Sequence, residues 1–231
     1  MRFCPFAATL RGSRVMSRPL RIDFFSDIAC PWCAIGLSSL LLALERIGSE
    51  VDARIVLHPF ELNPDMQAEG EMIVDYLGRK YGRTPAQIAE MHAMIRARGA
   101  EVGFTFGPRE YVYNTFDAHR LLHWAGIENK QLPLKRALLQ AYHTDGKPTN
   151  DPEVLVAAAV AVGLDALQAR SVLDSGAYAD DVRAAERQSS QLGISSVPSL
   201  IFDQRYLVTG GQPVDAFERA IREIAAKAAE V

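Results

Sequence analysis

The sequence predicts an α/β fold in which a strand–helix–strand unit and a strand–strand–helix unit enclose a long helical block. Three observations lead to this prediction. A β-type run, an apolar run at helical spacing and a second β-type run fill the segment up to about residue 60. The pattern from residue 63 to residue 185 is almost wholly helical. Two short β-type runs and one amphipathic run close the sequence.

The first unit has the order of a βαβ motif. Residues 21–26 are rich in aromatic and branched side chains, which is typical of a strand. Apolar residues then recur at helical spacing until Gly48, namely Leu37, Leu40, Leu41, Leu44 and Ile47. Residues 51–58 form a second predicted strand, which stops at Pro59. A helix between two strands in this order predicts a βαβ unit.

The helical block shows no repeat and no flexible linker. The predicted helices cover residues 71–81, 85–98, 115–125, 134–143, 152–162 and 164–175. Asn150-Asp151-Pro152-Glu153 is typical of a helix start, with a capping side chain, a proline and an acidic residue in turn. Residues 154–162 are apolar on every face and predict a buried helix.

The last unit is predicted to be a β-hairpin followed by a helix. The runs 199–202 and 206–209 flank a three-residue connection, Asp203-Gln204-Arg205. The closing helix carries Phe217, Ala220, Ile221 and Ile224 on one stripe. We therefore interpret residues 19–62 and 186–231 as one α/β core, and residues 63–185 as an inserted helical subdomain packed on it.

Composition and charge exclude several classes of partner. The formal net charge is −3 without a long block of one sign, so we expect no nucleic-acid partner. The longest apolar stretch, residues 154–164, falls short of the roughly 20 residues of a membrane-spanning helix, so we expect a soluble protein. Residues 1–18 carry four arginines and no acidic residue, and they lack the apolar region of a secretory signal. We expect these residues to be a poorly ordered N-terminal extension.

The three cysteines, Cys4, Cys30 and Cys33, do not resemble the framework of a secreted disulfide-rich protein. We therefore expect a cytoplasmic protein. Cys30 and Cys33 form the one close cysteine pair of the sequence. Structural zinc usually needs four ligands, and no second cysteine pair and no closely paired histidine accompanies Cys30 and Cys33. His119 and His123 have the i, i+4 spacing of a metal pair, but a packed helix face is the better interpretation. We expect no metal and no cofactor besides a redox-active disulfide.

The strongest signal is the motif Cys30-Pro31-Trp32-Cys33 at the start of the first predicted helix. Unpaired N–H groups and the helix dipole stabilise a thiolate there, and such motifs lower a thiol pKa to between roughly 3.5 and 7.5. Cys33, one turn further on, is positioned to resolve a mixed disulfide. Pro31 sets the helix entry, and Trp32 offers an apolar lip to a substrate. Nearby Asp27 is interpreted as the cap of a turn.

With these motifs in place, the chain resembles the DsbA family, and within it the FrnE-like branch. Relatives of this branch include 2-hydroxychromene-2-carboxylate isomerases and kappa-class glutathione transferases. The resemblance covers nearly the whole chain after Arg18. It rests on Phe25-Ser26-Asp27, Cys30-Pro31-Trp32-Cys33, Ile35-Gly36, Phe60-Glu61-Leu62-Asn63-Pro64, the run from Asn114 to Leu121, Val197-Pro198 and Gly210-Gly211-Gln212-Pro213.

The resemblance implies a thioredoxin-like fold with the helical subdomain inserted after the second strand. It also implies that Pro198 is a cis-proline facing the cysteine pair, and that the backbone of Val197 pairs with a bound peptide or glutathione. Asn114 and His119 are expected beside the active-site groove, in contact with substrate. Ser196 and Ser199 depart from the family pattern, which affects the expected shape of the substrate site and not the reaction type.

The expected function is that of a protein-disulfide oxidoreductase or isomerase acting through a mixed disulfide. Its substrate would be a protein or small thiol that carries a disulfide or a dithiol. Glutathione as co-substrate and a homodimer are both compatible with the resemblance. Two alternatives stay open: a glutathione-dependent isomerase or transferase, in whose branches a serine replaces Cys30, and a non-catalytic binding protein with an idle or zinc-binding pair. Arg79, Lys80, Arg83, Arg109 and Glu110 are interpreted as solvated charges.

Overall fold

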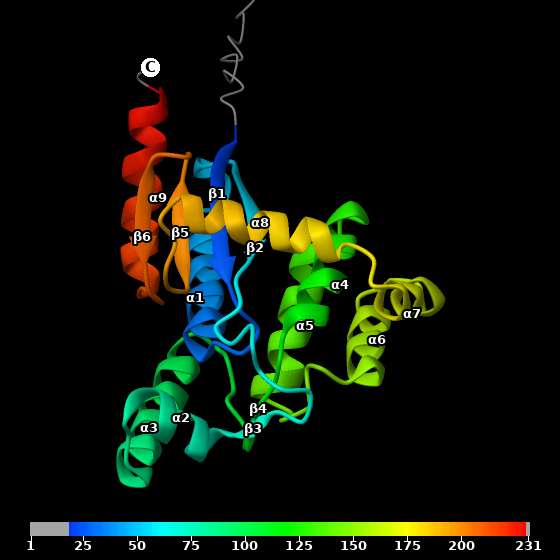
Figure 1. The fold of residues 1–231 in the computed structure, drawn as a ribbon. Coiled ribbons are helices and arrows are strands. Elements are labelled where there is room, and N and C mark those ends of the chain that lie inside the picture. Colours follow the sequence, from blue (N-terminus) through cyan, green and yellow to red (C-terminus); the bar gives the residue numbers. More distant parts are fainter. Residues whose placement is uncertain (1–18, 230–231) are drawn as a thin grey trace, which may run out of the picture.

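The computed structural model describes residues 19–229, and within them a four-stranded mixed sheet forms the centre of the molecule (Figure 1). The strand order is β2-β1-β5-β6. Strand β1 (Leu20–Ser26) pairs in parallel with β2 (Ala53–Pro59) and antiparallel with β5 (Ser199–Phe202). Strand β6 (Tyr206–Thr209) completes the predicted hairpin with β5. The expected α/β fold of thioredoxin-like type is confirmed.

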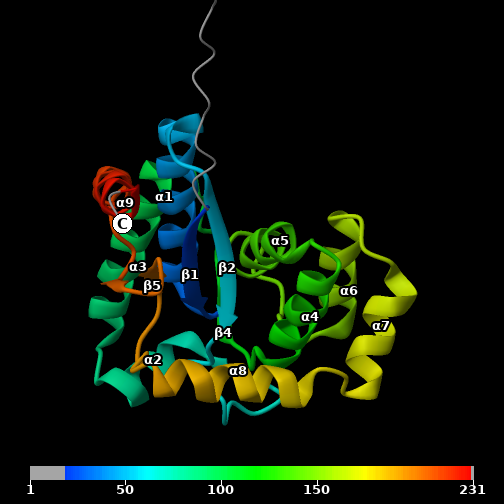
Figure 2. The same cartoon turned by 90° about the horizontal axis from the view of Figure 1, so that it is seen from above.

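Helices cover both faces of this sheet (Figure 2). Helix α1 (Pro31–Ile47) and helix α9 (Val214–Ala229) lie together on one face, and α8 (Ala179–Gln191) crosses the other. A 3₁₀ turn (Gly48–Glu50) follows α1. Within residues 19–229, the segment 31–50 is long and apolar enough by length and composition alone to cross a membrane, but half of it is buried inside the fold. Its apolar side chains therefore belong to the core.

The helical block contains the remaining elements and divides into two groups (Figure 1). One group lies beside β2, and the other lies below the sheet near the first turn of α1. The first group consists of α4 (Phe116–Ile127), α5 (Gln131–His143), α6 (Pro152–Ala161) and α7 (Ala166–Ser175). The second consists of α2 (Ile73–Tyr81), α3 (Pro85–Glu101) and a small ribbon of β3 (Glu71–Met72) with β4 (Tyr111–Val112).

The two groups are packed differently. Side chains of α4 to α7 share one hydrophobic core with the sheet, α1 and α9; Phe24, Leu121 and Leu138 are examples that are fully buried. The α2–α3 hairpin instead has a small core of its own, formed by Ile73, Tyr76, Leu77, Ile88 and Val112. The hairpin is therefore a separately packed element beside the first turn of α1.

Three expectations differ from the structure. The helix predicted from residue 71 begins at Ile73, because Glu71 and Met72 pair with β4. No predicted helix corresponds to α8, although the helical block was extended to residue 185. The prediction that 154–162 forms a buried helix is wrong for part of its surface, because α6 packs through one face only and Val160 is half exposed. The expected N-terminal extension, 1–18, lies outside the described residues.

Candidate functional site

The cysteine pair lies where β1 ends and α1 begins. Cys30 is the N-cap residue of α1 with an extended backbone conformation, and Pro31 occupies the first helical position. Proline suits this position because its fixed φ is helical and its missing N–H has no partner there anyway. The backbone N–H of Cys33 donates to the carbonyl of Cys30 at 3.1 Å. The motif thus places Cys30 at the N-terminal end of the helix, where N–H groups and the dipole favour an anion.

The two thiols have contrasting environments. The thiol of Cys30 lies 3.6 Å from the carbonyl oxygen of Val197, and the peptide bond between Val197 and Pro198 is cis, as expected. Hydrogen bonds from the thiol and backbone N–H of Cys33 outweigh burial and lower the pKa of Cys30. Burial raises the pKa of Cys33 well above its ordinary value. The thiol of Cys30 is therefore the first of the two to ionise as the pH rises, and Cys33 stays protonated.

Side chains of the helical block hold the loop that precedes Cys30. Arg109 donates to the carbonyl of Ala29 at 3.2 Å, and Nε2 of His143 lies 2.9 Å from the carbonyl of Ile28. Arg109 also lies 3.2 Å from Nδ1 of His143, which indicates a neutral ring with its proton on Nε2. Burial, followed by the charge of Arg109, holds the pKa of His143 well below its ordinary value. The interpretation of Arg109 as a solvated charge is therefore wrong.

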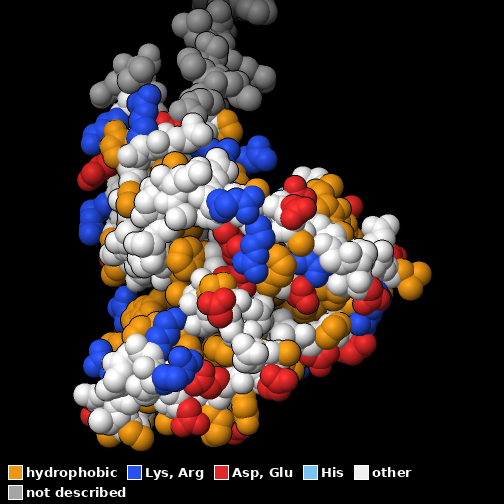
Figure 3. All heavy atoms as spheres, viewed as in Figure 1, with side chains coloured by type: hydrophobic (Ala, Val, Ile, Leu, Met, Phe, Trp, Pro, Cys, Tyr) orange, Lys and Arg blue, Asp and Glu red, His pale blue; other side chains and the backbone are white. Residues whose placement is uncertain are grey.

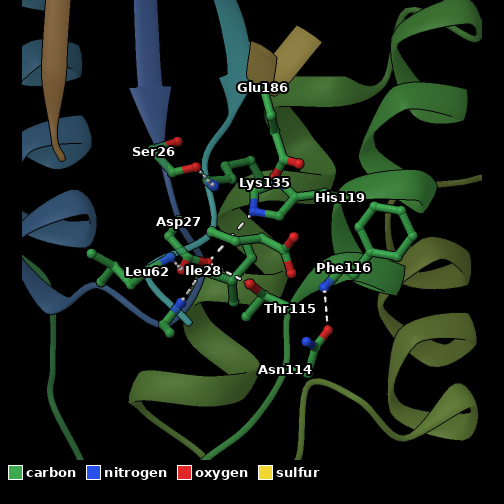
Figure 4. A network of polar contacts seen from close by, with 12 residues as sticks. Ser26, Asp27, Ile28, Leu62, Asn114, Thr115, Phe116, His119, Lys135 and Glu186 are labelled. Atoms are coloured by element: carbon green, nitrogen blue, oxygen red, sulfur yellow. Dashed lines mark hydrogen bonds and ion pairs between the residues drawn. The ribbon is translucent and has the colours of Figure 1, made fainter. Parts of the chain in front are cut away.

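Asp27 is the centre of a buried polar network behind the thiols (Figure 4). Its Oδ1 accepts hydrogen bonds from the N–H of Ala29 at 3.2 Å and from the hydroxyl of Thr115 at 2.7 Å. Its Oδ2 accepts from the N–H of Leu62 at 2.7 Å, and Nε2 of His119 lies 3.5 Å from Oδ1. Burial acts to raise the pKa of Asp27, but these partners together hold it below its ordinary value. Asp27 caps the predicted turn and also carries a buried negative charge.

Lys135 on α5 is a buried cation close to the thiols, and it is absent from the site residues predicted from the sequence. Its ammonium group lies 3.5 Å from the carbonyl oxygen of Ser26 (Figure 4). Its side chain is almost wholly buried. Burial lowers the pKa of Lys135, while the charge of Lys135 acts to lower the pKa of Cys33. The sequence does carry a signal for this burial, because Lys135 shares one face of the helix with the apolar residues Leu138, Leu139 and Tyr142.

Cys30 opens into a groove of about 600 Å³ between α1, the α2–α3 hairpin and the loop before β5. Pro31, Trp32 and Val197 line this groove, in agreement with their expected position. Further lining comes from the segment after β2 and from the hairpin. These residues include Phe60, Glu61, Leu62, Asn63, Ile73, Tyr76, Leu77, Lys80, Arg83, Met91, Ile95 and Arg109. Lys80 and Arg83 therefore border the same groove as Cys30.

Three of the expected substrate-binding residues do not line the groove. Pro198 packs behind it, where a Cβ atom on Gly36 would lie 3.2 Å from Cγ of Pro198. Asn114 accepts from the N–H of Phe116 at 2.8 Å and donates to the carbonyl of Pro64 at 3.3 Å, so it anchors the start of α4 (Figure 4). The side chain of His119 is buried and faces Asp27. Both Asn114 and His119 support the site from the helical block, because α4 packs behind the loop.

Glu61 contributes an unusual carboxylate to the groove. Its side chain is 2% exposed and pairs with Arg183 of α8, which also binds Glu186 at 2.8 Å. The Arg183 guanidinium stacks 3.8 Å from the centre of the Phe116 ring. Burial, and then the charge of Glu186, raise the pKa of Glu61 to about 7 against the opposing effect of Arg183. Glu61 therefore carries a proton for part of the time near neutral pH.

The histidines of α4 face different surroundings. The ring of His123 stacks on Tyr178 at 5.0 Å, whereas His119 faces Asp27. In the part of the chain that the structure describes, no group of three or more histidine, cysteine, aspartate or glutamate side chains could hold a metal ion.

Comparisons with known proteins agree with this geometry. The family model for the DSBA-like thioredoxin domain matches residues 21–222. A probable DsbA oxidoreductase from Streptomyces coelicolor is 35% identical, with a TM-score of 0.83 over 88% of this chain and 89% of that one. The protein YwbO of Bacillus subtilis, described as uncharacterized, is 26% identical over 88% of this chain and 96% of its own. A 2-hydroxychromene-2-carboxylate isomerase has a TM-score of 0.69 at 14% identity, covering 91% of this chain and 98% of that one, which shows a shared fold alone.

Proposed function

Because the chain belongs to the DSBA-like thioredoxin domain family, we propose that it is a thiol–disulfide oxidoreductase in which Cys30 attacks and Cys33 resolves. The observation that carries this proposal is the asymmetry of the two thiols. Cys30 caps a helix, lines the groove with 4% of its surface exposed and has a lowered pKa, whereas Cys33 is fully buried with a raised pKa. An exchange catalyst needs one thiolate that attacks readily and a second thiol that stays protonated until the mixed disulfide forms.

The proposed reaction begins with attack by the Cys30 thiolate on one sulfur of a substrate disulfide. A Cys30–substrate bond forms as the substrate S–S bond breaks, and the other substrate sulfur leaves as a thiolate that takes a proton from solvent. Cys33 then loses its proton and attacks Cys30, which releases the second substrate thiolate. The substrate gains two electrons and two protons, and the enzyme ends with a Cys30–Cys33 disulfide. A thiol reductant restores the dithiol, and the reverse sequence oxidises a substrate dithiol.

Polar groups behind the pair support the second step. Cys33 must ionise while its thiol is buried, and burial opposes this. The charge of Lys135 stabilises the Cys33 thiolate electrostatically, so it favours the ionised form at the moment of attack. Val197 supports the first step, because its carbonyl lies beside Cys30 at the edge where a substrate backbone would approach.

Glutathione-dependent isomerisation is the alternative that the isomerase fold would allow. The cysteine at position 30 favours exchange chemistry, because attack on a disulfide is what a thiolate adds over a hydroxyl. Glutathione as co-substrate, a homodimer and a cytoplasmic location are parts of the same proposal. The location rests on cysteine usage, since one close pair and one distant cysteine are unlike the framework of a secreted disulfide-rich protein.

The test is insulin-disulfide reduction by dithiothreitol, with the wild type compared with Cys30→Ser and Cys33→Ser. We expect the wild type to accelerate reduction and both variants to lose this activity. Cys4→Ser is the matched control and should retain it, because the mechanism does not use Cys4. An inert wild type, or full activity of Cys33→Ser, would contradict the two-thiol mechanism and favour the isomerase alternative.

A further inference from the structure

The wall of the groove facing Cys30 is apolar. Ile73 and Leu77 lie one turn apart on α2, and Met91 and Ile95 lie one turn apart on α3. Side chains four residues apart share a helix face, so each helix presents a short apolar strip to the groove. Trp32 adds an aromatic surface beside Cys30. Figure 3 shows hydrophobic surface between the sheet side of the molecule and the α2–α3 hairpin, with Lys and Arg side chains gathered around it.

Three cations border the same groove, Lys80, Arg83 and Arg109, and none has a carboxylate partner among residues 19–229. Lys80 donates to the carbonyl of Leu62 at 2.9 Å and to the side-chain oxygen of Asn63 at 2.8 Å. Arg109 donates to a carbonyl as well. Neutral acceptors fix the positions of Lys80 and Arg109 without cancelling their charge.

The groove has little negative charge to oppose these cations. Glu61 is the one carboxylate among its lining residues in the described part of the chain. It pairs with Arg183, which Glu186 shares, and it carries a proton for part of the time near neutral pH. The groove is therefore positive although the whole chain has a formal net charge of −3. A positive cleft with low-dielectric walls raises the local concentration of anionic partners.

From this juxtaposition of apolar strips and uncompensated cations, we infer that the groove selects a polypeptide segment with an acidic and an apolar residue next to its disulfide-bonded cysteine. The inference rests on the proposed function and names its substrate class. The apolar side chain packs on the strips of α2 and α3, and the carboxylate pairs with Lys80, Arg83 or Arg109. A wholly polar small disulfide, such as that of glutathione, would leave the apolar strips uncovered.

The experiment measures formation of the mixed disulfide in a Cys4→Ser/Cys33→Ser variant, in which Cys30 is the one thiol left to react. Short peptides with one cysteine are activated as mixed disulfides with thionitrobenzoate. Attack by Cys30 joins the peptide to the enzyme and releases the coloured thionitrobenzoate anion, so each event is counted. The peptides differ only at the two positions beside the cysteine, which hold Asp and Leu, Lys and Leu, or Asp and Ser. The Asp-Leu peptide should react roughly tenfold faster than the Lys-Leu peptide, and added salt should reduce the difference.

Charge-reversal variants test whether Lys80 and Arg83 cause the preference for the acidic peptide. Arg83→Glu and Lys80→Glu should each lower the Asp-to-Lys rate ratio by about threefold or more, because each replaces attraction with repulsion. Arg96→Glu is the matched control: Arg96 is exposed on α3 and does not line the groove, so the ratio should stay unchanged. A ratio of two rates does not depend on how much of a variant folds. If Lys80→Glu fails to fold, exposed Arg83 still tests the inference.

The outcomes separate the inference from the function on which it rests. Equal rates for all peptides, or an unchanged ratio in both charge-reversal variants, would overturn the selectivity while the oxidoreductase function stands. A faster reaction with the glutathione–thionitrobenzoate disulfide than with the Asp-Leu peptide would overturn the polypeptide substrate in favour of a small thiol. No reaction with any activated disulfide would refute the proposed function, and the inference with it.

Discussion

The hydroxyl of Thr115 donates a 2.7 Å hydrogen bond to Oδ1 of Asp27, so the start of α4 is tied to the loop before Cys30. The two residues are 88 positions apart in the chain. His119, one turn further along α4, faces the same carboxylate. The helical block therefore controls the charge behind the cysteine pair, and substitutions there should change thiol chemistry without touching a sulfur.

Asp27→Asn should lower the pKa of the Cys30 thiol, because the Asp27 carboxylate acts to raise it. The variant should also lose roughly 1–3 kcal/mol of unfolding free energy, since buried hydrogen bonds to a charged acceptor are weakened. The pH dependence of Cys30 alkylation by iodoacetamide measures the first effect. Asp23→Asn is the control: Asp23 is paired with Arg21 and His58, so its loss should leave the alkylation profile in place. If the alkylation profile of Asp27→Asn shifted to higher pH, the pKa of Cys30 would have risen, which would contradict this prediction.

Lys135→Met should slow the resolving step more than the attacking step. The ammonium group of Lys135 acts to lower the pKa of Cys33, so its loss reduces the fraction of Cys33 thiolate. Rapid mixing with an activated disulfide should show normal formation of the mixed disulfide but roughly tenfold slower release at neutral pH. Raising the pH should reduce the defect. The exposed Lys147→Met serves as control, and equal slowing of both steps would point to a merely structural role for Lys135.

The unfolding free energy should depend on Glu61 in the neutral pH range. The folded-state pKa of about 7 lies above the ordinary value of 4.5, so the folded protein binds more protons between these limits. The contribution of Glu61 to the unfolding free energy is therefore fully present below pH 4.5 and is lost as the pH rises through 7. The loss is on the order of 2 kcal/mol. Glu61→Gln should remove this slope in denaturant titrations across the range. An identical slope in the variant would show that another group is responsible.

Gly36→Ala should destabilise the protein by ~1–3 kcal/mol. An added Cβ would lie 3.2 Å from Cγ of Pro198 and 3.3 Å from Cα of Gly211, and both neighbours belong to tightly packed segments. Denaturant unfolding measures the change. Gly82→Ala would strain a positive φ without steric contact, so it separates crowding at Pro198 from a general effect of replacing glycine. Insulin reduction should fall in Gly36→Ala but not in Gly82→Ala, because only Gly36 supports the segment that carries Val197.

Much of the fold could be predicted from local pattern. Strand, helix and strand followed one another before residue 60 because apolar periodicity and the proline at the helix start are local signals. The hairpin across Asp203 and Gln204 was predicted for the same reason, and both residues adopt positive φ there. The small β3–β4 ribbon was missed because each of its strands has two residues, too few for any period.

The supporting side chains of the site could not be predicted in this way. Lys135 reaches Ser26 across 109 positions, His143 reaches Ile28 across 115, and Arg109 reaches Ala29 across 80. A charged residue in a helical pattern is usually solvated, and only the packing of α5 behind the active-site loop buries Lys135 and His143. The exclusion of Asn114 and His119 from the groove has the same cause, because α4 packs behind Asp27.

The sequence by itself determined where the cysteine pair lies and why the pKa of Cys30 is lowered, since both follow from two cysteines beside a proline at a helix start. It also determined the order of strands and helices, which short-range periodicity sets. Only the tertiary structure decided which charges surround the thiols. A charge acts through space and changes strength with burial, so Lys135, Asp27, Glu61 and the cations of the groove acquire their roles from contacts between distant parts of the chain.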